Sequence, residues 1–269
     1  MPYFKNKHGA NLYYAADGGG APPIVFLHPL PFDHRIWVHQ TFEFSFHHRI
    51  LALDFPGLGC SDPPPSSTST ISSLAEDVKD MMQAEGVDQA AIIVGLSIGG
   101  AVAQQFILRY PEKVRALVLS GTSSSYRAEE VRSKFSDRVQ GYQSPDARAY
   151  YARNLELLFS PRFAASPQGR NLLELYATAK VDFPSVSRHF AALLECDLEE
   201  EIQSIKVPTL VIAGDEDRAF FDSKRIAEKI PRAKFVPIGG AGHVVCYEQP
   251  QLFNAAMRDF LKHSNLGSD

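Results

Sequence analysis

The chain has 269 residues, of which 45% are hydrophobic and 22% charged, a composition typical of a globular protein with a full core. Its net charge is −4 and it has no local run of Lys and Arg, which argues against a nucleic-acid partner. It also lacks a signal-peptide core and any apolar stretch near the ~20 residues that span a bilayer, so we expect a cytoplasmic protein with no membrane partner.

Short apolar runs recur along the chain. Residues 2–16 are expected to form two short strands around the turn His8-Gly9. Further runs without polar alternation are typical of strands buried on both faces of a parallel sheet. They cover residues 24–27, 50–53, 90–94, 116–119, 209–213 and 235–238.

Helical patterns lie between several of these runs. Ser72 is expected to cap a helix whose Leu74, Val78, Met81 and Met82 share one side. Other helices are predicted over 100–110, 221–230 and 251–263, the first two ending before a proline. Strands and helices in alternation predict an α/β fold with a mostly parallel central sheet flanked by helices.

The alternation stops between about Thr122 and Lys206. Here the candidates are helical, over 128–142, 146–159, 171–179 and 185–195. We predict a helical cap or lid over residues 122–206, inserted after the sixth strand, and a core made of residues 1–121 and 207–269. An independent helical domain is the alternative, but the sheet pattern resumes at Pro208.

Residues 95–99, Gly-Leu-Ser-Ile-Gly, separate the apolar run 90–94 from a helical stretch. A strand, a tight turn and a helix in this order are what a nucleophile elbow requires. The serine at such a turn is pushed clear of the sheet, and the glycines let the backbones pass without a Cβ between them. Ser97 is therefore the predicted nucleophile.

A serine hydroxyl needs a histidine to take its proton and a carboxylate to orient that histidine. On this architecture they follow the serine in the order acid, histidine. Beyond residue 213 only His243 and His263 remain, and His263 lies in a polar tail near the end of the chain. His243 follows a strand in a Gly-rich loop, so it is the predicted base.

The acid should lie on a loop at the carboxyl end of a strand. The loop after residues 116–119 has no carboxylate before Glu129, whereas residues 214–217 supply Asp215, Glu216 and Asp217. Loop position alone does not choose among these three. Asp217 is our choice, and Asp215 is the second candidate.

An oxyanion requires two backbone N–H donors. One should come from Ile98, directly after the nucleophile, and the other from the loop after the third strand. In Pro29-Leu30-Pro31 only Leu30 has an N–H, and Pro31 restricts its conformation. Leu30 and Ile98 are thus the predicted oxyanion hole.

Other conspicuous residues are assigned structural roles. His28 is expected to stabilise its loop through ring hydrogen bonds, and Asp54, which precedes the serine, to stabilise a turn. Cys60, Cys196 and Cys246 are an odd number without close pairing, so we expect reduced thiols, and none is assigned a function.

The nine histidines raise the question of a metal site. His34, His39, His47 and His48 cluster in the sequence, but there is no H-E-x-x-H or C-x-x-C motif and no acidic partner at ligand spacing. We therefore predict no metal and no cofactor.

With these residues in place, the chain resembles the α/β-hydrolase superfamily over nearly its full length. The likeness is carried by residues 26–31, 53–62, 95–100 and 239–250. The family's acid commonly closes a G-x-x-D loop, which matches Gly214 to Asp217. Pro29 departs from the family pattern, which usually has glycine after the oxyanion-loop histidine. Within the superfamily the chain looks most similar to small enol-lactonases, carboxylesterases and cofactor-free haloperoxidases.

The resemblance and the residues together predict an esterase or lactonase that works through an acyl-enzyme on a small-molecule substrate. A low-turnover binding or signalling protein and a C–C bond hydrolase of a diketone are the alternatives, since both can use the same triad. Aromatic residues of the cap, most of them expected to be its core, favour an apolar pocket. The substrate-binding residues, the substrate and the oligomeric state are not predicted.

Overall fold

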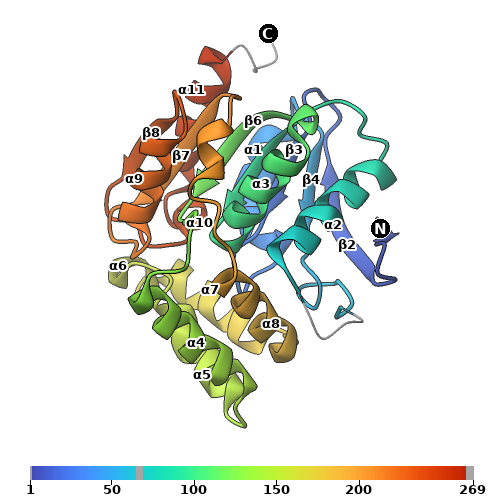
Figure 1. Ribbon diagram of the computed structural model, residues 1–269. Helices are drawn as coiled ribbons and strands as arrows, with labels where there is room; N and C mark the ends of the chain where they lie inside the picture. The colour runs from blue at the N-terminus through green and yellow to red at the C-terminus, as the bar shows by residue number, and fades with distance from the viewer. Residues whose placement is uncertain (1, 65–68, 265–269) are drawn as a thin grey trace.

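An eight-stranded sheet forms the centre of the computed structural model, which describes residues 2–64 and 69–264 (Figure 1). The strand order is β1-β2-β4-β3-β5-β6-β7-β8; β1 to β2 and β2 to β4 are antiparallel, and the remaining pairs are parallel. The strands are β1 (Tyr3–Lys5), β2 (Asn11–Asp17), β3 (Ile24–Leu27), β4 (Ile50–Leu53), β5 (Ala91–Leu96), β6 (Val114–Ser120), β7 (Thr209–Gly214) and β8 (Lys234–Ile238). Every predicted apolar run forms a strand, and the mostly parallel α/β sheet is confirmed.

The strand order explains where a site can form. From β3 the chain moves to β4 on one side, and it then returns to place β5 on the other side of β3. The carboxyl ends of β3 and β5 therefore lie at the point where the strand order reverses, which is where ligands bind in open α/β sheets. The predicted Leu30 and Ser97 follow these two strands.

Helices cover both faces of the sheet (Figure 1). The core helices are α1 (Val38–Phe44), α2 (Ile71–Ala84), α3 (Ile98–Arg109), α9 (Phe220–Lys229), α10 (Val245–Glu248) and α11 (Pro250–His263), with 3₁₀ turns η1 (His34–Trp37), η2 (Pro111–Lys113) and η3 (Glu201–Ser204). Ser72 does not cap α2, contrary to our prediction. Thr70 does, because its hydroxyl accepts the Ser73 N–H (2.9 Å) while the Ser73 hydroxyl accepts the Thr70 N–H (3.0 Å), a reciprocal capping box.

Five helices lie between β6 and β7 and form the layer below the sheet in Figure 1. They are α4 (Glu129–Gln143), α5 (Ala147–Glu156), α6 (Pro161–Ala164), α7 (Pro167–Thr178) and α8 (Phe183–Leu194). The ring centre of Phe190 lies 5.7 Å from that of Phe135 and 5.6 Å from that of Tyr142. The ring centres of Phe135 and Tyr126 are 5.2 Å apart. These aromatic side chains thus pack against one another within the helical segment. Its role as a lid and the domain boundaries stay predictions.

The helical segment rests on the loop that follows β4. In α8 the buried His189 donates from Nε2 to the carbonyl of Pro56 (2.8 Å), and burial lowers the pKa of His189 to about 4. A Cβ on Gly57 would lie 2.2 Å from the Ser185 hydroxyl. Such close approach requires glycine here and fixes α8 directly over the loop.

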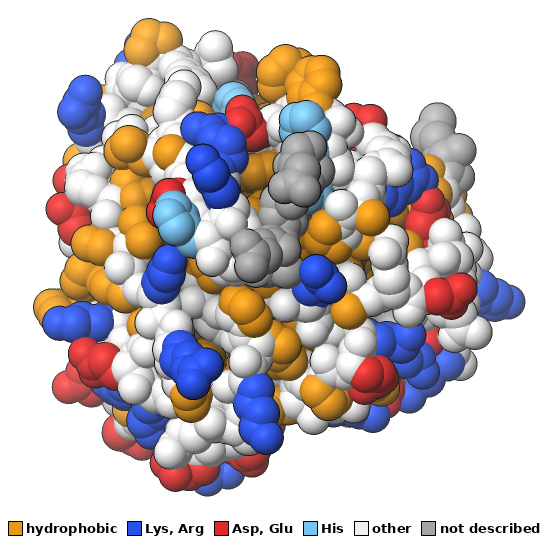
Figure 2. Space-filling model, turned by 90° about the horizontal axis from the view of Figure 1, so that it is seen from above, with side chains coloured by type: hydrophobic (Ala, Val, Ile, Leu, Met, Phe, Trp, Pro, Cys, Tyr) orange, Lys and Arg blue, Asp and Glu red, His pale blue; other side chains and the backbone are white. Residues whose placement is uncertain are grey.

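The surface seen from above in Figure 2 mixes basic and acidic side chains with hydrophobic ones. Within residues 2–64 and 69–264, no helix is long and apolar enough to cross a membrane.

Candidate active site

Ser97 occupies the turn between β5 and α3 in a strained backbone conformation. Its φ is 57° and its ψ is −119°, outside the regions that non-glycine residues ordinarily adopt. A Cβ on Gly95 would lie 2.2 Å from the Gly99 carbonyl oxygen, and one on Gly99 would lie 2.1 Å from that of Leu27. Both glycines are therefore required for the sharp turn, as the elbow pattern predicts.

The turn is held from the end of β6. The Ser97 N–H donates to the Ser120 carbonyl (2.9 Å), and the Thr122 hydroxyl donates to the Ser97 carbonyl (2.8 Å). These hydrogen bonds, one on each side of the residue, stabilise a conformation that would otherwise relax.

His243 and Asp217 lie in direct contact. The Nδ1 atom of His243 is 3.0 Å from both carboxylate oxygens of Asp217, and the Ala219 N–H donates to the same carboxylate (3.0 Å). The Asp217 side chain is 3% exposed and that of His243 is 16% exposed. Burial alone raises the pKa of Asp217, but the adjacent imidazole and the hydrogen bonds outweigh it and lower that pKa below its ordinary value.

Asp215 has a different partner. Its carboxylate accepts the Gly240 N–H (2.7 Å), so it fastens the loop of residues 239–243 to the loop that carries Asp217. The structure thus pairs His243 with the first choice from the sequence rather than with the second candidate.

Gly121 joins the serine turn to the His–Asp pair. It lies between Ser120 and Thr122, which hold Ser97, and has a φ of +49°. A Cβ on Gly121 would be 2.9 Å from Asp217 Oδ2 and 3.1 Å from His243 Nδ1. Sequence reasoning missed this contact; the available signal was a glycine directly after a predicted strand.

The two predicted oxyanion donors follow the neighbouring strands β3 and β5. Ile98 is the first residue of α3, and Leu30 lies in a turn closed by the Phe32 N–H donating to the Pro29 carbonyl (3.0 Å). Within the described part of the chain, neither the Leu30 N–H nor the Ile98 N–H has a hydrogen-bond acceptor. Both residues are buried, so neither donor lies on the open surface of the molecule.

His28 supports the turn around Leu30, as predicted. Its Nε2 accepts the Phe55 N–H (3.0 Å), so Nδ1 carries the proton and donates to the Pro29 carbonyl (3.0 Å). The ring is fully buried, and burial lowers the pKa of His28. A neutral imidazole thus ties the Leu30 loop to the loop after β4.

A second His–Asp pair joins His34 to Asp54. The His34 Nδ1 atom is 2.9 and 3.0 Å from the Asp54 oxygens, and the carboxylate also accepts the N–H groups of His34 (2.7 Å) and Cys60 (2.9 Å). Burial lowers the pKa of His34, but Asp54 outweighs it and raises that pKa above the ordinary value. Asp54 thus stabilises loops, as predicted.

Ligand atoms of Asp33, His34 and Asp54 lie within 4.8 Å of one another, an arrangement that the sequence spacing did not reveal. The Asp33 carboxylate is engaged by the Arg35 guanidinium (2.6 and 2.9 Å) and Asp54 by the donors just described. The cluster therefore fits a hydrogen-bonded ion-pair network better than a metal site.

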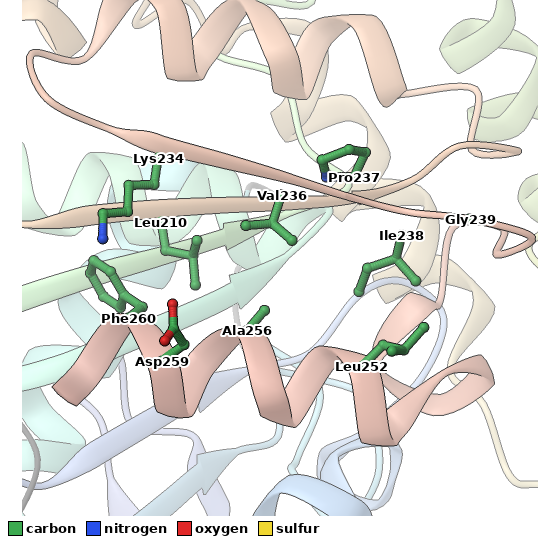
Figure 3. A pocket seen from close by; sticks show the side chains of 10 residues that line it. All are labelled: Leu210, Lys234, Val236, Pro237, Ile238, Gly239, Leu252, Ala256, Asp259 and Phe260. Atoms are coloured by element: carbon green, nitrogen blue, oxygen red, sulfur yellow. The ribbon is translucent and has the colours of Figure 1, made fainter. Parts of the chain in front are cut away.

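A separate cavity of about 310 Å³ lies between β8 and α11 (Figure 3). Its walls are mostly apolar, with Lys234, Asp259 and Phe260 together at one end. None of its lining residues is a predicted site residue. The three cysteines, Cys60, Cys196 and Cys246, are free, and burial raises the pKa of Cys196 to about 12.

Comparison with known proteins gives a consistent result. The chain is 28% identical to the AB hydrolase superfamily protein YisY of Bacillus subtilis, covering 96% of this chain and 98% of that protein. It is 26% identical to 3-oxoadipate enol-lactonase 1 of Acinetobacter baylyi, covering 96% of this chain and 95% of that protein. It also matches, at 27% identity, a polyketide synthase of Burkholderia thailandensis, of whose length it spans 12%.

Among solved structures, the enol-lactonase from Burkholderia xenovorans superposes with a TM-score of 0.88 at 28% identity, covering 97% of this chain and all of that one. The names of these relatives support a hydrolase. The sequence model described as alpha/beta hydrolase fold matches residues 22–250. The chain therefore belongs to the α/β-hydrolase family.

Proposed function

We propose that this protein is a serine hydrolase that cleaves a carboxylic ester or lactone through an acyl-enzyme. Ser97 is the nucleophile, His243 the general base and Asp217 the carboxylate that orients the base. One observation carries the proposal: a strained serine at a strand–helix turn and a contacting His–Asp pair meet at the same three residues, 120–122.

In the proposed reaction, the Ser97 hydroxyl attacks the substrate carbonyl while His243 Nε2 takes its proton. Asp217 holds the opposite N–H of the ring and stabilises the imidazolium that forms. The N–H groups of Leu30 and Ile98 bind the oxyanion, and each such donor contributes about 10²- to 10³-fold to the rate. The tetrahedral intermediate collapses as His243 returns the proton to the leaving alcohol.

Deacylation repeats these steps with water as the nucleophile, activated by His243, and regenerates Ser97. The chemistry requires only side chains and backbone donors already present, so no cofactor is proposed. In a lactone the leaving alcohol stays attached to the acyl group, so one product results.

The proposed substrate class rests on the family and on the helical segment. The relatives include enol-lactonases, and a structure of an enol-lactonase superposes on 97% of this chain. Phe32, in the loop that carries Leu30, packs on Phe159 and Tyr176 of the helical segment, with ring centres 6.0 and 4.7 Å apart, so the segment is apolar where it meets this loop. We propose a small-molecule ester or lactone with an apolar acyl part.

The test is steady-state hydrolysis of a panel of chromogenic esters and lactones of varied acyl length, with wild type and Ser97→Ala. We expect Ser97→Ala to abolish turnover while its circular dichroism matches wild type. Retention of more than a few per cent of the activity would contradict the assignment.

The same panel separates the alternatives. Labelling of Ser97 by a fluorophosphonate with negligible turnover of every ester and lactone would favour a ligand-binding protein. Turnover of a diketone in place of the esters would favour C–C bond hydrolysis.

A further inference from the structure

The backbone that carries His243 is held from two sides. On one side the Glu216 N–H donates to the Ala241 carbonyl (3.0 Å), which joins it to the Asp217 loop. On the other side the Leu158 carbonyl accepts the N–H groups of both His243 (3.0 Å) and Val244 (3.2 Å). Leu158 lies in the helical segment between α5 and α6, so this segment contacts the predicted base through its backbone.

Glu248, the last residue of α10, completes the second side. Its Oε1 accepts the Gly242 N–H (2.9 Å), one residue before His243. Its Oε2 accepts both the N–H (3.1 Å) and the hydroxyl (2.7 Å) of Ser160. One carboxylate thus bridges the backbone next to His243 and the start of α6.

The bridge lies in a tight, buried place. Glu248 is 9% exposed, and within the described residues it forms no ion pair, so three uncharged donors satisfy its carboxylate. Burial raises the pKa of Glu248, and the hydrogen bonds act against that rise. A Cβ on Gly242 would lie 2.6 Å from the Ser160 nitrogen and 2.8 Å from Glu248 Oε1, so the contact leaves no room for a side chain there.

We infer that Glu248 is a positioning residue that fixes His243 against the helical segment, so that the placement of this segment and the placement of the base are coupled. The inference rests on the proposed function, in which His243 takes the Ser97 proton. A base displaced by about 1 Å lowers the rate by about 100-fold, so a bridge beside it affects catalysis without touching substrate.

Glu248→Gln tests the bridge without changing its shape. The amide has one acceptor oxygen, so its NH₂ must face an N–H donor, either that of Gly242 or that of Ser160. We expect kcat for a short-chain ester to fall about 10- to 100-fold with KM changed by less than about twofold. The rate of Ser97 labelling by a fluorophosphonate should fall in parallel, since both reactions use His243.

Glu156→Gln is the matched control. Glu156 is an exposed glutamate of the same helical segment and, within the described part of the chain, its side chain has no hydrogen bond. Glu156→Gln removes one negative charge, as Glu248→Gln does, and we expect its kcat, KM and labelling rate to equal those of wild type. Circular dichroism and the melting temperature establish that each variant is folded at the assay temperature.

Ser160→Ala is the second variant, and it carries the test if Glu248→Gln does not fold. It removes only the hydroxyl donor, and we expect a smaller loss of kcat, about 3- to 10-fold. In the double variant the loss should not exceed that of Glu248→Gln alone, because both changes break one bridge.

Three results would overturn the inference: folded Glu248→Gln with wild-type kcat and labelling rate, a raised KM at unchanged kcat, or an unchanged kcat in Ser160→Ala. Each leaves the proposed function intact as long as Ser97→Ala is inactive. If Ser97→Ala hydrolyses the ester, the proposed function itself fails.

Discussion

Two buried His–Asp pairs within residues 2–64 and 69–264 have nearly the same geometry, while a third, His263 with Asp259, is exposed on α11. His243 Nδ1 is 3.0 Å from both oxygens of Asp217, and His34 Nδ1 is 2.9 and 3.0 Å from those of Asp54. In both pairs the carboxylate is buried and the imidazole is slightly exposed. The contact between imidazole and carboxylate therefore does not by itself mark a catalytic pair.

What differs is the surrounding structure. Asp54 also accepts two backbone N–H groups, from His34 and Cys60, and so binds the loops after β3 and β4 to each other. The His34 ring contacts Tyr13, with the ring centres 5.0 Å apart. His243 instead lies beside Gly121, whose neighbours hold the strained Ser97. The elbow, rather than the pair, sets the function that we propose.

The two pairs should differ most in their effect on kcat when the imidazole of each is removed. His243→Ala should lower kcat for a short-chain ester by at least about 10⁴-fold, because the serine loses its base. His34→Ala should leave kcat within about threefold of wild type. Initial rates of both purified variants check this, and a comparable loss in the two would contradict the distinction.

Neutralising each carboxylate should separate catalysis from stability. Asp217→Asn should lower kcat by about 10⁴-fold, since the amide no longer selects the required tautomer. Asp54→Asn should lower the free energy of unfolding by about 2–4 kcal/mol, because buried donors lose their charged acceptor. Urea unfolding measures the loss of stability, and kcat of the folded protein measures the loss of catalysis. A large loss of kcat in folded Asp54→Asn would contradict a purely structural role for Asp54.

Gly121→Ala sharpens the comparison at the contact itself. Its Cβ would press on Asp217 and His243 at 2.9 and 3.1 Å, so we expect kcat to fall about 10- to 100-fold. Gly86→Ala is the control, because Gly86 has a similar positive φ (+72°) with nothing within 4 Å of the added Cβ. It should lower the melting temperature slightly and leave kcat unchanged; equal losses of kcat would mean that backbone strain alone is responsible.

The smallest effect concerns the pH dependence of stability. The folded-state pKa of His34 is raised, so protonation of His34 stabilises the fold fully below its unfolded pKa of about 6.5. This contribution is lost as the pH rises through the folded-state pKa. As the pH rises from about 6.5 through the folded-state pKa, the melting temperature of His34→Gln should therefore fall less than that of wild type. Calorimetry at a series of pH values measures this. Parallel curves of melting temperature against pH for the two proteins would contradict the assigned role of His34.

Much of the fold was predictable because buried parallel strands are continuous apolar runs, as in residues 24–27 and 50–53. The sharp turn at Ser97 was predictable for a similar reason, because it needs glycines at fixed spacing and these are visible in the sequence. Local chemistry was less certain, since Thr70 and Ser72 are equally good caps by residue type and only the backbone geometry selects Thr70.

Contacts between distant segments were the part that the sequence did not reveal. Asp215 and Asp217 share one loop, and only the fold shows which of them meets His243. The pairing of His34 with Asp54 spans 20 residues, and that of Ser160 with Glu248 spans 88. No local periodicity encodes such pairings, because they depend on how the loops at the carboxyl ends of the strands converge.

The most direct measurement is mass spectrometry of the protein quenched during turnover of an activated acetate ester. If Ser97 is the nucleophile, one acetyl group should be found on the peptide that contains Ser97, and none in Ser97→Ala. Ester turnover with the acetyl group on another residue, or with undiminished rate in Ser97→Ala, would contradict the proposed acyl-enzyme.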